Sequence, residues 1–245
     1  MNLGECYDGL KKLRLDLDID SLEIVEEVAR LRGLWKPEKV RVVLLAESHA
    51  YTRQEDFVTF WRVRDTIYEG RYVRFVYCLA NGEKELVPSV HQNKGTSQFW
   101  KIFYSCLHRV SNNRDFKPIL HSTPPDPRIA NKINLLSSLK EAGIWLTDAS
   151  IVGINHLKDV RKRKEILRYC WQFTGPMLES LDPEPKHVIV IGKLVEKTLK
   201  REIVSLDPHY TPLPQPQAHL PAPGYFQFYK TYYETCSRFR NGTLP

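Results

Sequence analysis

Two groups capable of acid–base chemistry follow an apolar stretch in the first quarter of the chain. Glu47 and His49 flank Ser48, directly after the run at residues 39–46 (KVRVVLLA). A carboxylate and an imidazole placed just past a strand could move a proton or orient a water molecule. The same residue types also suit a helix-capping or solvated turn, so this motif has to be weighed together with others along the chain.

A second set of polar side chains lies in the proline-rich segment at residues 207–224 (DPHYTPLPQPQAHLPAPG). Its six prolines fix φ and remove backbone donors, which makes the segment stiff and excludes it from a helix or a central strand. Such a segment could hold Gln215, Gln217 and His219 against a ligand at little entropic cost. A purely structural connector is the alternative.

The pattern of apolar residues predicts that helices and strands alternate along the chain. Short, β-branched runs predict strands at 39–46, 144–147 and 187–191, whereas residues 72–79 suit either a strand or an ordered extended segment. Helices, the first with Ser21 as its N-cap, are predicted at 21–32, 97–110, 129–141, 159–181 (with a break at Gly175-Pro176), 193–202 and after Gly224. Residues 121–128 are expected to form a rigid loop.

We therefore expect an α/β fold with three layers, α/β/α, around a central, mostly parallel, four-stranded sheet. A single domain should span residues 1–245, with a helical N-terminal extension at 1–36 and a core at 37–240. Sheets of this kind bind ligands beyond the carboxyl ends of their strands. Polar residues follow three of these ends, at Glu47 to His49, at Asp148 and at Gly192-Lys193.

The composition favours a polyanionic partner and excludes several classes of enzyme. The formal net charge is +7, and basic residues gather between Lys158 and Arg168, where a solvated helix is the alternative. The five cysteines form no CxxC pair, so we expect neither a metal site nor another cofactor. The chain contains no GxGxxG or GxxxxGK[ST] motif, which disfavours dinucleotide-dependent and P-loop enzymes.

The hydropathy of the chain gives an expectation for its location. No apolar run approaches the ~18 residues of a membrane helix, and the N-terminus lacks the apolar core of a signal peptide. We therefore expect a monomeric, cytoplasmic protein that does not associate with a membrane.

The order and spacing of these motifs resemble those of the uracil-DNA glycosylase superfamily, over residues 39–234. In that family the first strand runs into a water-positioning loop, and residues 46–50 (AESHA) fall at that loop. Glu47 lies at the glutamate of one version of the loop, and Ser48 lies at the aspartate of another. The resemblance implies catalytic roles for Glu47 and Ser48, and contacts of Ala46 and His49 with the base.

Three further stretches imply contacts with the base or with DNA. Residues 75–78 (FVYC) are similar to the family's stretch with a base-stacking aromatic residue, which puts Tyr77 in that role. Residues 143–149 (GIWLTDA) match the strand that carries the base-reading asparagine, and Asp148 falls at that asparagine. Residues 188–193 (VIVIGK) resemble the last core strand and its turn. Lys193 follows this strand end and could contact a DNA phosphate, with a solvated lysine as the alternative.

The proline-rich segment matches the family's closing motif in its spacing up to Gly224. Gln215 falls on the catalytic histidine, and His219, with Leu220 beside it, falls on the intercalating leucine. The resemblance therefore implies that Gln215 takes part in catalysis, and that Gln217, His219 and Leu220 contact DNA.

The resemblance implies a DNA glycosylase that hydrolyses the bond between deoxyribose and a damaged or deaminated base, in single- or double-stranded DNA and without a cofactor. Two departures from the family pattern change the expected base. Gln215 can donate a hydrogen bond but cannot act as an acid, and an ionised Asp148 only accepts. Because Asp148 would repel O4 of uracil and suit an exocyclic amine or a ring N–H, we expect a base other than plain uracil.

Two other functions stay open. The first is a catalytically impaired nucleic-acid-binding protein of the same fold, which Gln215 favours because it cannot carry a proton to the leaving base. The second is an unrelated α/β hydrolase, which would need a nucleophile with its base. The absence of a GxSxG motif disfavours this second alternative.

Overall fold

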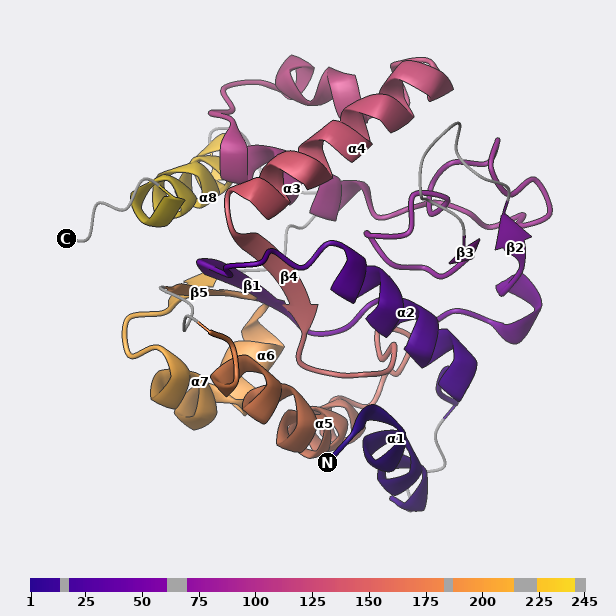
Figure 1. The fold of residues 1–245 in the computed structure, drawn as a ribbon, viewed down its shortest axis with the longest axis vertical. Helices are drawn as coiled ribbons and strands as arrows, with labels where there is room; N and C mark the ends of the chain where they lie inside the picture. The colour runs from indigo at the N-terminus through magenta and orange to yellow at the C-terminus, as the bar shows by residue number, and fades with distance from the viewer. Residues whose placement is uncertain (14–17, 61–69, 183–186, 214–223, 241–245) are drawn as a thin grey trace.

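The centre of the protein is a parallel four-stranded sheet, seen in the computed structural model, which describes residues 1–13, 18–60, 70–182, 187–213 and 224–240 (Figure 1). Its strands lie side by side in the order β4 (Ile144–Asp148), β1 (Val42–Ala46), β5 (His187–Ile191) and β6 (Thr211–Leu213). Every residue of β1, β4 and β5 is buried. Burial on both faces explains why these strands have largely apolar sequences without alternation.

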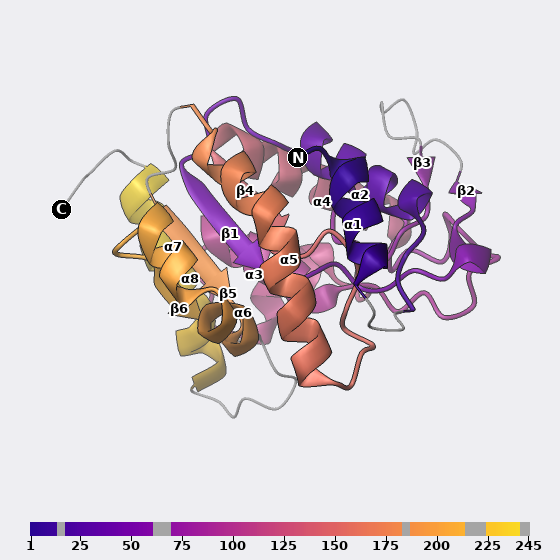
Figure 2. The same ribbon diagram turned by 90° about the horizontal axis from the view of Figure 1, so that it is seen from below.

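Helices cover both faces of the sheet and give the molecule three layers (Figures 1 and 2). One layer consists of α3 (Ser97–Leu107), α4 (Pro125–Glu141) and α8 (Gly224–Arg240). The opposite layer consists of α5 (Val160–Glu179), α6 (Lys193–Thr198) and α7 (Lys200–Leu206). The predicted α/β class and the four-stranded sheet between helices are confirmed, and all four strands run parallel.

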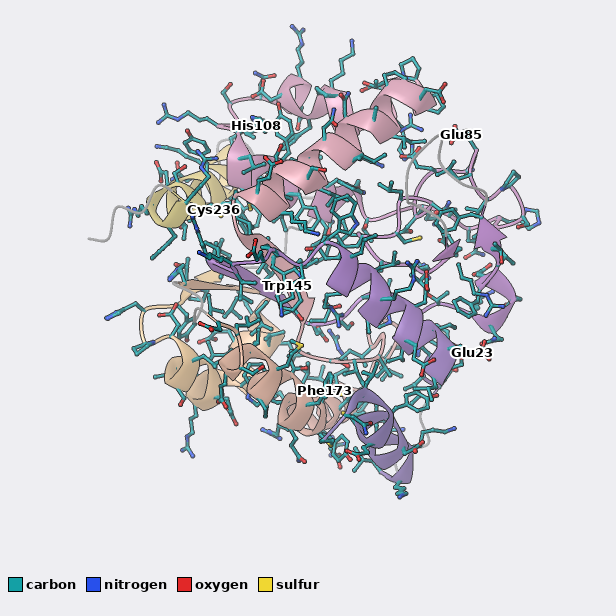
Figure 3. The ribbon with its side chains drawn as sticks, in the orientation of Figure 1. Glu23, Glu85, His108, Trp145, Phe173 and Cys236 are labelled. Atoms are coloured by element: carbon teal, nitrogen blue, oxygen red, sulfur yellow. The ribbon has the colours of Figure 1, made fainter. Side chains whose placement is uncertain are left out.

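Two helices precede the sheet in sequence, α1 (Leu3–Lys12) and α2 (Leu22–Leu34), and Ser21 is the N-cap residue of α2 as predicted. Helix α1 lies against α5. Helix α2 lies beside β4, where the indole N–H of Trp145 donates to the backbone carbonyl of Arg32 at 3.1 Å (Figure 3). Residues of α1 and α2 contribute to the same hydrophobic core as the sheet.

Three boundaries differ from the predicted ones. Helix α4 begins at Pro125, inside the predicted loop at 121–128, because proline suits the first turn of a helix, where no donor is needed. Helix α5 continues through Gly175-Pro176, so the predicted break is wrong; the proline lies in the last turns and removes one hydrogen bond without ending the helix. The predicted helix at 193–202 is divided at Leu199 into α6 and α7.

Residues 72–79 form neither a strand nor an extended segment, but a buried series of turns. The amide of Cys78 donates to the carbonyl of Phe75, and the chain thereby folds back within a few residues. The apolar composition of this segment therefore reflects burial rather than strand pairing. The remaining short elements are η1 (Gln54–Asp56), η2 (Asn113–Ile119) and a two-stranded antiparallel sheet of β2 (Thr59–Phe60) and β3 (Gly70–Arg71).

Residues 80–96, called the 80–96 loop below, are fixed in place by their own side chains. The Asn93 amide accepts a hydrogen bond from the backbone of Gly82 (2.5 Å) and donates one to the carbonyl of Ala80 (2.7 Å). Gly82 and Gly95 both have positive φ and approach each other closely. A Cβ atom on Gly95 would lie 2.7 Å from the Gly82 Cα, so only glycine fits there.

A buried ion cluster ties the 80–96 loop to α4. Glu83 is fully buried and accepts hydrogen bonds from the side chains of Arg128 and Lys132, the latter at 2.5 Å. Both cations are almost completely buried as well, so they depend on this one carboxylate for compensation of their charge. The loop is therefore held against α4 by charge as well as by packing.

Replacing Glu83 should destabilise the protein strongly. We expect Glu83→Ala to lower the free energy of unfolding by about 3–5 kcal/mol, because it leaves two buried cations without their carboxylate. Urea denaturation measures the change. The matched control is Glu85→Ala: the Glu85 side chain is 51% exposed and reaches Arg128 only at 3.8 Å (Figure 3). Its loss should cost less than about 1 kcal/mol, and equal effects of the two substitutions would contradict the role assigned to Glu83.

Candidate ligand-binding site at the strand ends

A cavity of about 360 Å³ opens at the carboxyl ends of β1 and β4, where parallel sheets bind their ligands. Its walls come from four parts of the chain: residues 48–50 after β1, residues 74–76, the stretch 94–99 that joins the 80–96 loop to α3, and the end of β4 with Leu146, Asp148 and the following Asn155. The volume suits a small heterocyclic ligand.

The register between β1 and β4 brings the sequence-predicted residues together. Ala46 pairs with Asp148, and the amide of Ala149 donates to the Ala46 carbonyl at 2.8 Å. The two chains leave the sheet side by side, since the amide of Ser150 then donates to the Glu47 carbonyl at 3.0 Å. The strands thus place Ala46 beside Asp148. They also bring the loop that follows β1 to the cavity.

His49 lines the cavity, and its side chain is completely buried. Its Nε2 atom lies 3.1 Å from Oδ2 of Asp20. Because an ionised carboxylate only accepts, Nε2 carries a proton. The other ring nitrogen, Nδ1, has no hydrogen-bond partner among the described residues and lies 3.9 Å from Oδ2 of Asp148. His49 therefore stands between two carboxylates.

Asp20 is almost completely buried and holds the loops around the site together. It accepts hydrogen bonds from the backbone amides of Thr52 (2.8 Å) and Gly153 (2.5 Å), besides its contact with His49. Burial alone would raise the pKa of Asp20, but the charge and hydrogen bond of His49 and the two amides outweigh it and lower the pKa below its ordinary value. Asp20 is thus ionised, and it connects the segments that carry His49, Thr52 and Gly153.

Asp148 lines the cavity and is 2% exposed. Its Oδ2 atom accepts a hydrogen bond from Nη2 of Arg32 at 2.8 Å, in a pair that is buried on both sides. Oδ1 accepts no hydrogen bond from the part of the chain that the structure describes. Asp20, His49, Asp148 and Arg32 therefore form one row in which acidic and basic side chains alternate, called the buried charge chain below.

Two members of the buried charge chain, Asp20 and Arg32, come from the predicted N-terminal extension and were missed as site residues. A signal for Arg32 is present in the sequence, because it lies on the apolar face of α2, next to the buried Leu31. A charged residue on the core face of a helix calls for a buried partner. Asp20 directly precedes the N-cap Ser21 and has the sequence character of an ordinary helix start.

The side chains of Glu47 and Ser48 lie in different environments. The Glu47 carboxylate forms a two-pronged ion pair with Arg163 in the first turns of α5, with Nε to Oε1 at 2.8 Å and Nη2 to Oε2 at 2.7 Å. Glu47 is not among the residues that line the cavity, whereas Ser48 is. The Ser48 hydroxyl accepts a hydrogen bond from the amide of Ile154 at 3.2 Å. Both residues were expected to be catalytic, and of the two only Ser48 lines the cavity.

Tyr77, the predicted stacking residue, lies in the core and does not line the cavity. Its hydroxyl accepts a hydrogen bond from the amide of Leu146 at 2.9 Å, and its ring stacks on Phe103. Burial raises the pKa of Tyr77 well above its ordinary value. Phe75 lines the cavity instead, because the turns at 72–79 give successive side chains directions that an extended segment would not.

Basic side chains lie around the mouth of the cavity. Arg74 and the exposed Lys94 belong to its lining, and Arg74 donates to the carbonyl of Tyr51 at 3.3 Å. Arg161, at the start of α5, has a side chain that is 96% exposed. Lys193 is exposed at the start of α6, beyond the end of β5, and is not part of the cavity lining.

The proline-rich segment is described only at its two ends. Residues 211–213 form β6, an edge strand that contains Pro212, in agreement with the rule that proline avoids central strands. Gln215, Gln217, His219 and Leu220 lie outside the described residues. Their predicted roles in catalysis and DNA binding stay predictions.

The fold and the site define an α/β protein with a ligand cavity at the carboxyl edge of a parallel sheet. No protein-family model matches the chain, and neither a curated protein nor a solved structure is significantly similar to it. Within the described ranges no cluster of histidine, cysteine, aspartate and glutamate is arranged to hold a metal ion. The helices in the same ranges include none that is long and apolar enough to span a membrane.

The ionised state of Asp20 should make stability depend on pH. We expect Asp20→Asn to lower the free energy of unfolding by about 1–3 kcal/mol at neutral pH, because asparagine cannot accept all three hydrogen bonds. Since the pKa of Asp20 is lowered on folding, its contribution is complete above the ordinary carboxyl value of 3.8 and is lost as the pH falls through the folded value. Urea titrations of both proteins at several pH values measure this.

The matched control for this experiment is Asp18→Asn, which removes an exposed carboxylate two residues away. It should change stability much less, and without the same dependence on pH. A difference between wild type and Asp20→Asn that stays constant from neutral pH to about pH 2 would contradict the ionised state of Asp20.

Proposed function

We propose that the protein is a DNA glycosylase-like enzyme that hydrolyses the N-glycosidic bond of a base other than plain uracil. The observation that supports this most is the position of Asp148. It corresponds to the family's base-reading asparagine, and it faces a cavity of base-compatible volume at the end of β4, beside the loop that follows β1. A glycosylase needs such a pocket because it must take the target base out of the stack.

Groups around the cavity can recognise a flipped base. The Phe75 ring supplies an aromatic wall, and Oδ1 of Asp148 supplies an acceptor for an amine or a ring N–H. A carbonyl oxygen placed against this carboxylate would be repelled and would leave buried polar groups unpaired, which costs about 1–3 kcal/mol. This chemistry disfavours uracil, whose O4 would face Asp148.

The bond to the base breaks with positive charge developing on the sugar, and a water molecule then adds to C1′. Ser48 lies at the cavity and can orient that water, and Glu47, beside it, can stabilise the charge if its carboxylate turns from Arg163. The basic residues at the cavity mouth and at the start of α5 suit contacts with the phosphates of the bound strand.

A second function, nucleic-acid binding without cleavage, is favoured by one specific observation. The Glu47 carboxylate is neutralised by both prongs of Arg163 and lies outside the cavity lining. In that arrangement no carboxylate reaches the sugar from the loop after β1. Gln215, which cannot act as an acid, favours the same alternative.

Base release from labelled oligonucleotides tests the proposed activity. Oligonucleotides that carry uracil, hypoxanthine, xanthine or only unmodified bases are incubated with the protein, and abasic sites are then cleaved with alkali. We expect release of a base that presents an amino group or a ring N–H to Asp148, as hypoxanthine can with its ring N–H, and little release of uracil. Glu47→Ala should slow release at least about 100-fold, because the group that stabilises the developing charge is lost.

The matched control is Glu55→Ala, since the Glu55 side chain is 70% exposed and lies outside the site. It should release the base at the wild-type rate. Absence of release from every substrate, with DNA still bound, would leave the binding function; rapid release of uracil would contradict the role given to Asp148.

The aromatic wall gives a second prediction. Phe75→Leu keeps an apolar side chain of similar size but removes the flat ring, so it should weaken binding of a single-stranded oligonucleotide by about five- to 100-fold. Tyr77→Phe should leave this affinity within about twofold and lower the free energy of unfolding by about 1–3 kcal/mol, because the amide of Leu146 loses its partner. Fluorescence anisotropy and urea denaturation measure the two effects. Weaker binding only in Tyr77→Phe would restore Tyr77 as the stacking residue.

A further inference from the structure

We infer that Arg32, supported by His49 and Asp20, determines which bases the cavity accepts, because it holds Asp148 as an ionised, acceptor-only group. The inference rests on the proposed function and names the substrate class of the same cavity: bases that present an amino group or a ring N–H to Asp148. Arg32 does not line the cavity, so it is a positioning residue that acts through Asp148.

The ion pair between Arg32 and Asp148 is the first support for this inference. A carboxyl group as deeply buried as that of Asp148 takes up a proton unless a cation compensates its charge. The guanidinium of Arg32 lies 2.8 Å from Oδ2 and is itself only 9% exposed. Water therefore screens the pair little, and the charge of each group depends on the other.

The second support is the position of His49. Its two ring nitrogens face two carboxylates, Asp20 at 3.1 Å and Asp148 at 3.9 Å, so the ring separates the two buried acidic groups. Asp20 is in turn fixed by the amides of Thr52 and Gly153. His49 is thereby held between the two carboxylates, and its contact with Asp20 fixes the orientation of its ring.

Within the described ranges, the two aromatic side chains next to the buried charge chain, those of Tyr77 and Phe75, carry no charge. The neighbouring hydroxyl of Tyr77 is neutral, since burial raises its pKa, and it already accepts from the amide of Leu146. Phe75 places its ring below the guanidinium of Arg32, at 5.4 Å, and its edge toward His49. The charge state of Asp148 is thus set from α2 and from the loop after β1.

The geometry has a direct consequence for the ligand. Because Arg32 occupies Oδ2, the oxygen that remains for a ligand is Oδ1. A lone acceptor binds an amino group or a ring N–H and repels a carbonyl oxygen. If Arg32 were removed, Asp148 could take up a proton, donate a hydrogen bond as well as accept one, and so bind both kinds of base edge.

Binding selectivity tests this inference without any need for base release. The probes are two fluorescent single-stranded oligothymidylates that differ only at one central position, which carries cytosine or uracil. A 2′-fluoro sugar at that position withdraws electrons from C1′ and prevents cleavage during the measurement. The full chain should bind the cytosine probe about tenfold more tightly than the uracil probe.

Three variants separate the roles of the pair. Asp148→Asn should reverse the preference, because the amide can donate to O4 of uracil. Arg32→Gln should reduce the ratio to less than about twofold, while Arg32→Lys, which restores the cation, should keep a preference for cytosine. A merely structural role of Arg32 would lower both affinities equally and leave the ratio unchanged. An unchanged ratio in folded Arg32→Gln, or a wild type without preference, would overturn the inference.

A fourth variant covers the case in which Arg32→Gln does not fold. His49→Asn removes the basic ring beside Asp148 and keeps the Arg32 pair, so the ratio should fall to about threefold or less, and an unchanged ratio would overturn the inference. The proposed glycosylase activity and the role of Arg32 in base selection can be rejected independently of each other. Selective binding without base release would reject the glycosylase activity and keep the inference, whereas base release without selectivity would do the reverse.

Discussion

The burial of two carboxylates, Asp20 and Asp148, is the constraint on which the rest of this site depends. A buried carboxylate needs a compensating cation or hydrogen-bond donors, which Arg32 supplies to Asp148, and which His49 and two backbone amides supply to Asp20. To bring these four groups together, α2 and the residues just before it have to pack beside β4. The loop after β1 must also turn inward rather than into solvent. Electrostatic compensation therefore determines the position of elements that local sequence preferences leave open.

A second buried ion cluster fixes another part of the cavity wall in the same way, by pairing charges from distant segments. Glu83 with Arg128 and Lys132 holds the 80–96 loop against α4, and the end of that loop leads into α3 at the cavity. The end of β4 supplies the part of the cavity wall that belongs to the sheet. The loop after β1, the residues around Asp20 and the 80–96 loop have no regular structure, and buried polar contacts fix all three. A close contact between two glycines also fixes the 80–96 loop, so the pocket has a defined shape without additional strands.

The strands at 39–46, 144–147 and 187–191 could be predicted because short, continuous, β-branched runs bounded by polar residues favour buried strands in a chain of alternating elements. Because two of these strands end at Ala46 and near Asp148, the residues Ala46, Ser48, His49 and Asp148 were expected at one edge of the sheet, and they do lie together there. Arg32 was missed although a charged residue on the apolar face of a helix calls for a buried partner. Asp20 was missed because its contacts with His49 and Thr52, 29 and 32 positions away, leave no periodic signal. Residues 72–79 were misjudged, because an apolar sequence is compatible with a strand and with a buried turn. In that segment Phe75 lines the cavity, whereas Tyr77, which the family resemblance put in the stacking role, does not.

The origin of Arg32 in α2 links ligand binding to the folding of the N-terminal segment. The segment before β1 carries two of the four side chains of the buried charge chain, and its departure would leave His49 and Asp148 each without one partner. A ligand that binds only the completed cavity must therefore stabilise the packing of α1 and α2 by its own free energy of binding, since the two equilibria are coupled in both directions. Protection of the first helices against proteolysis would then report on the occupancy of a site that lies at the far ends of the strands.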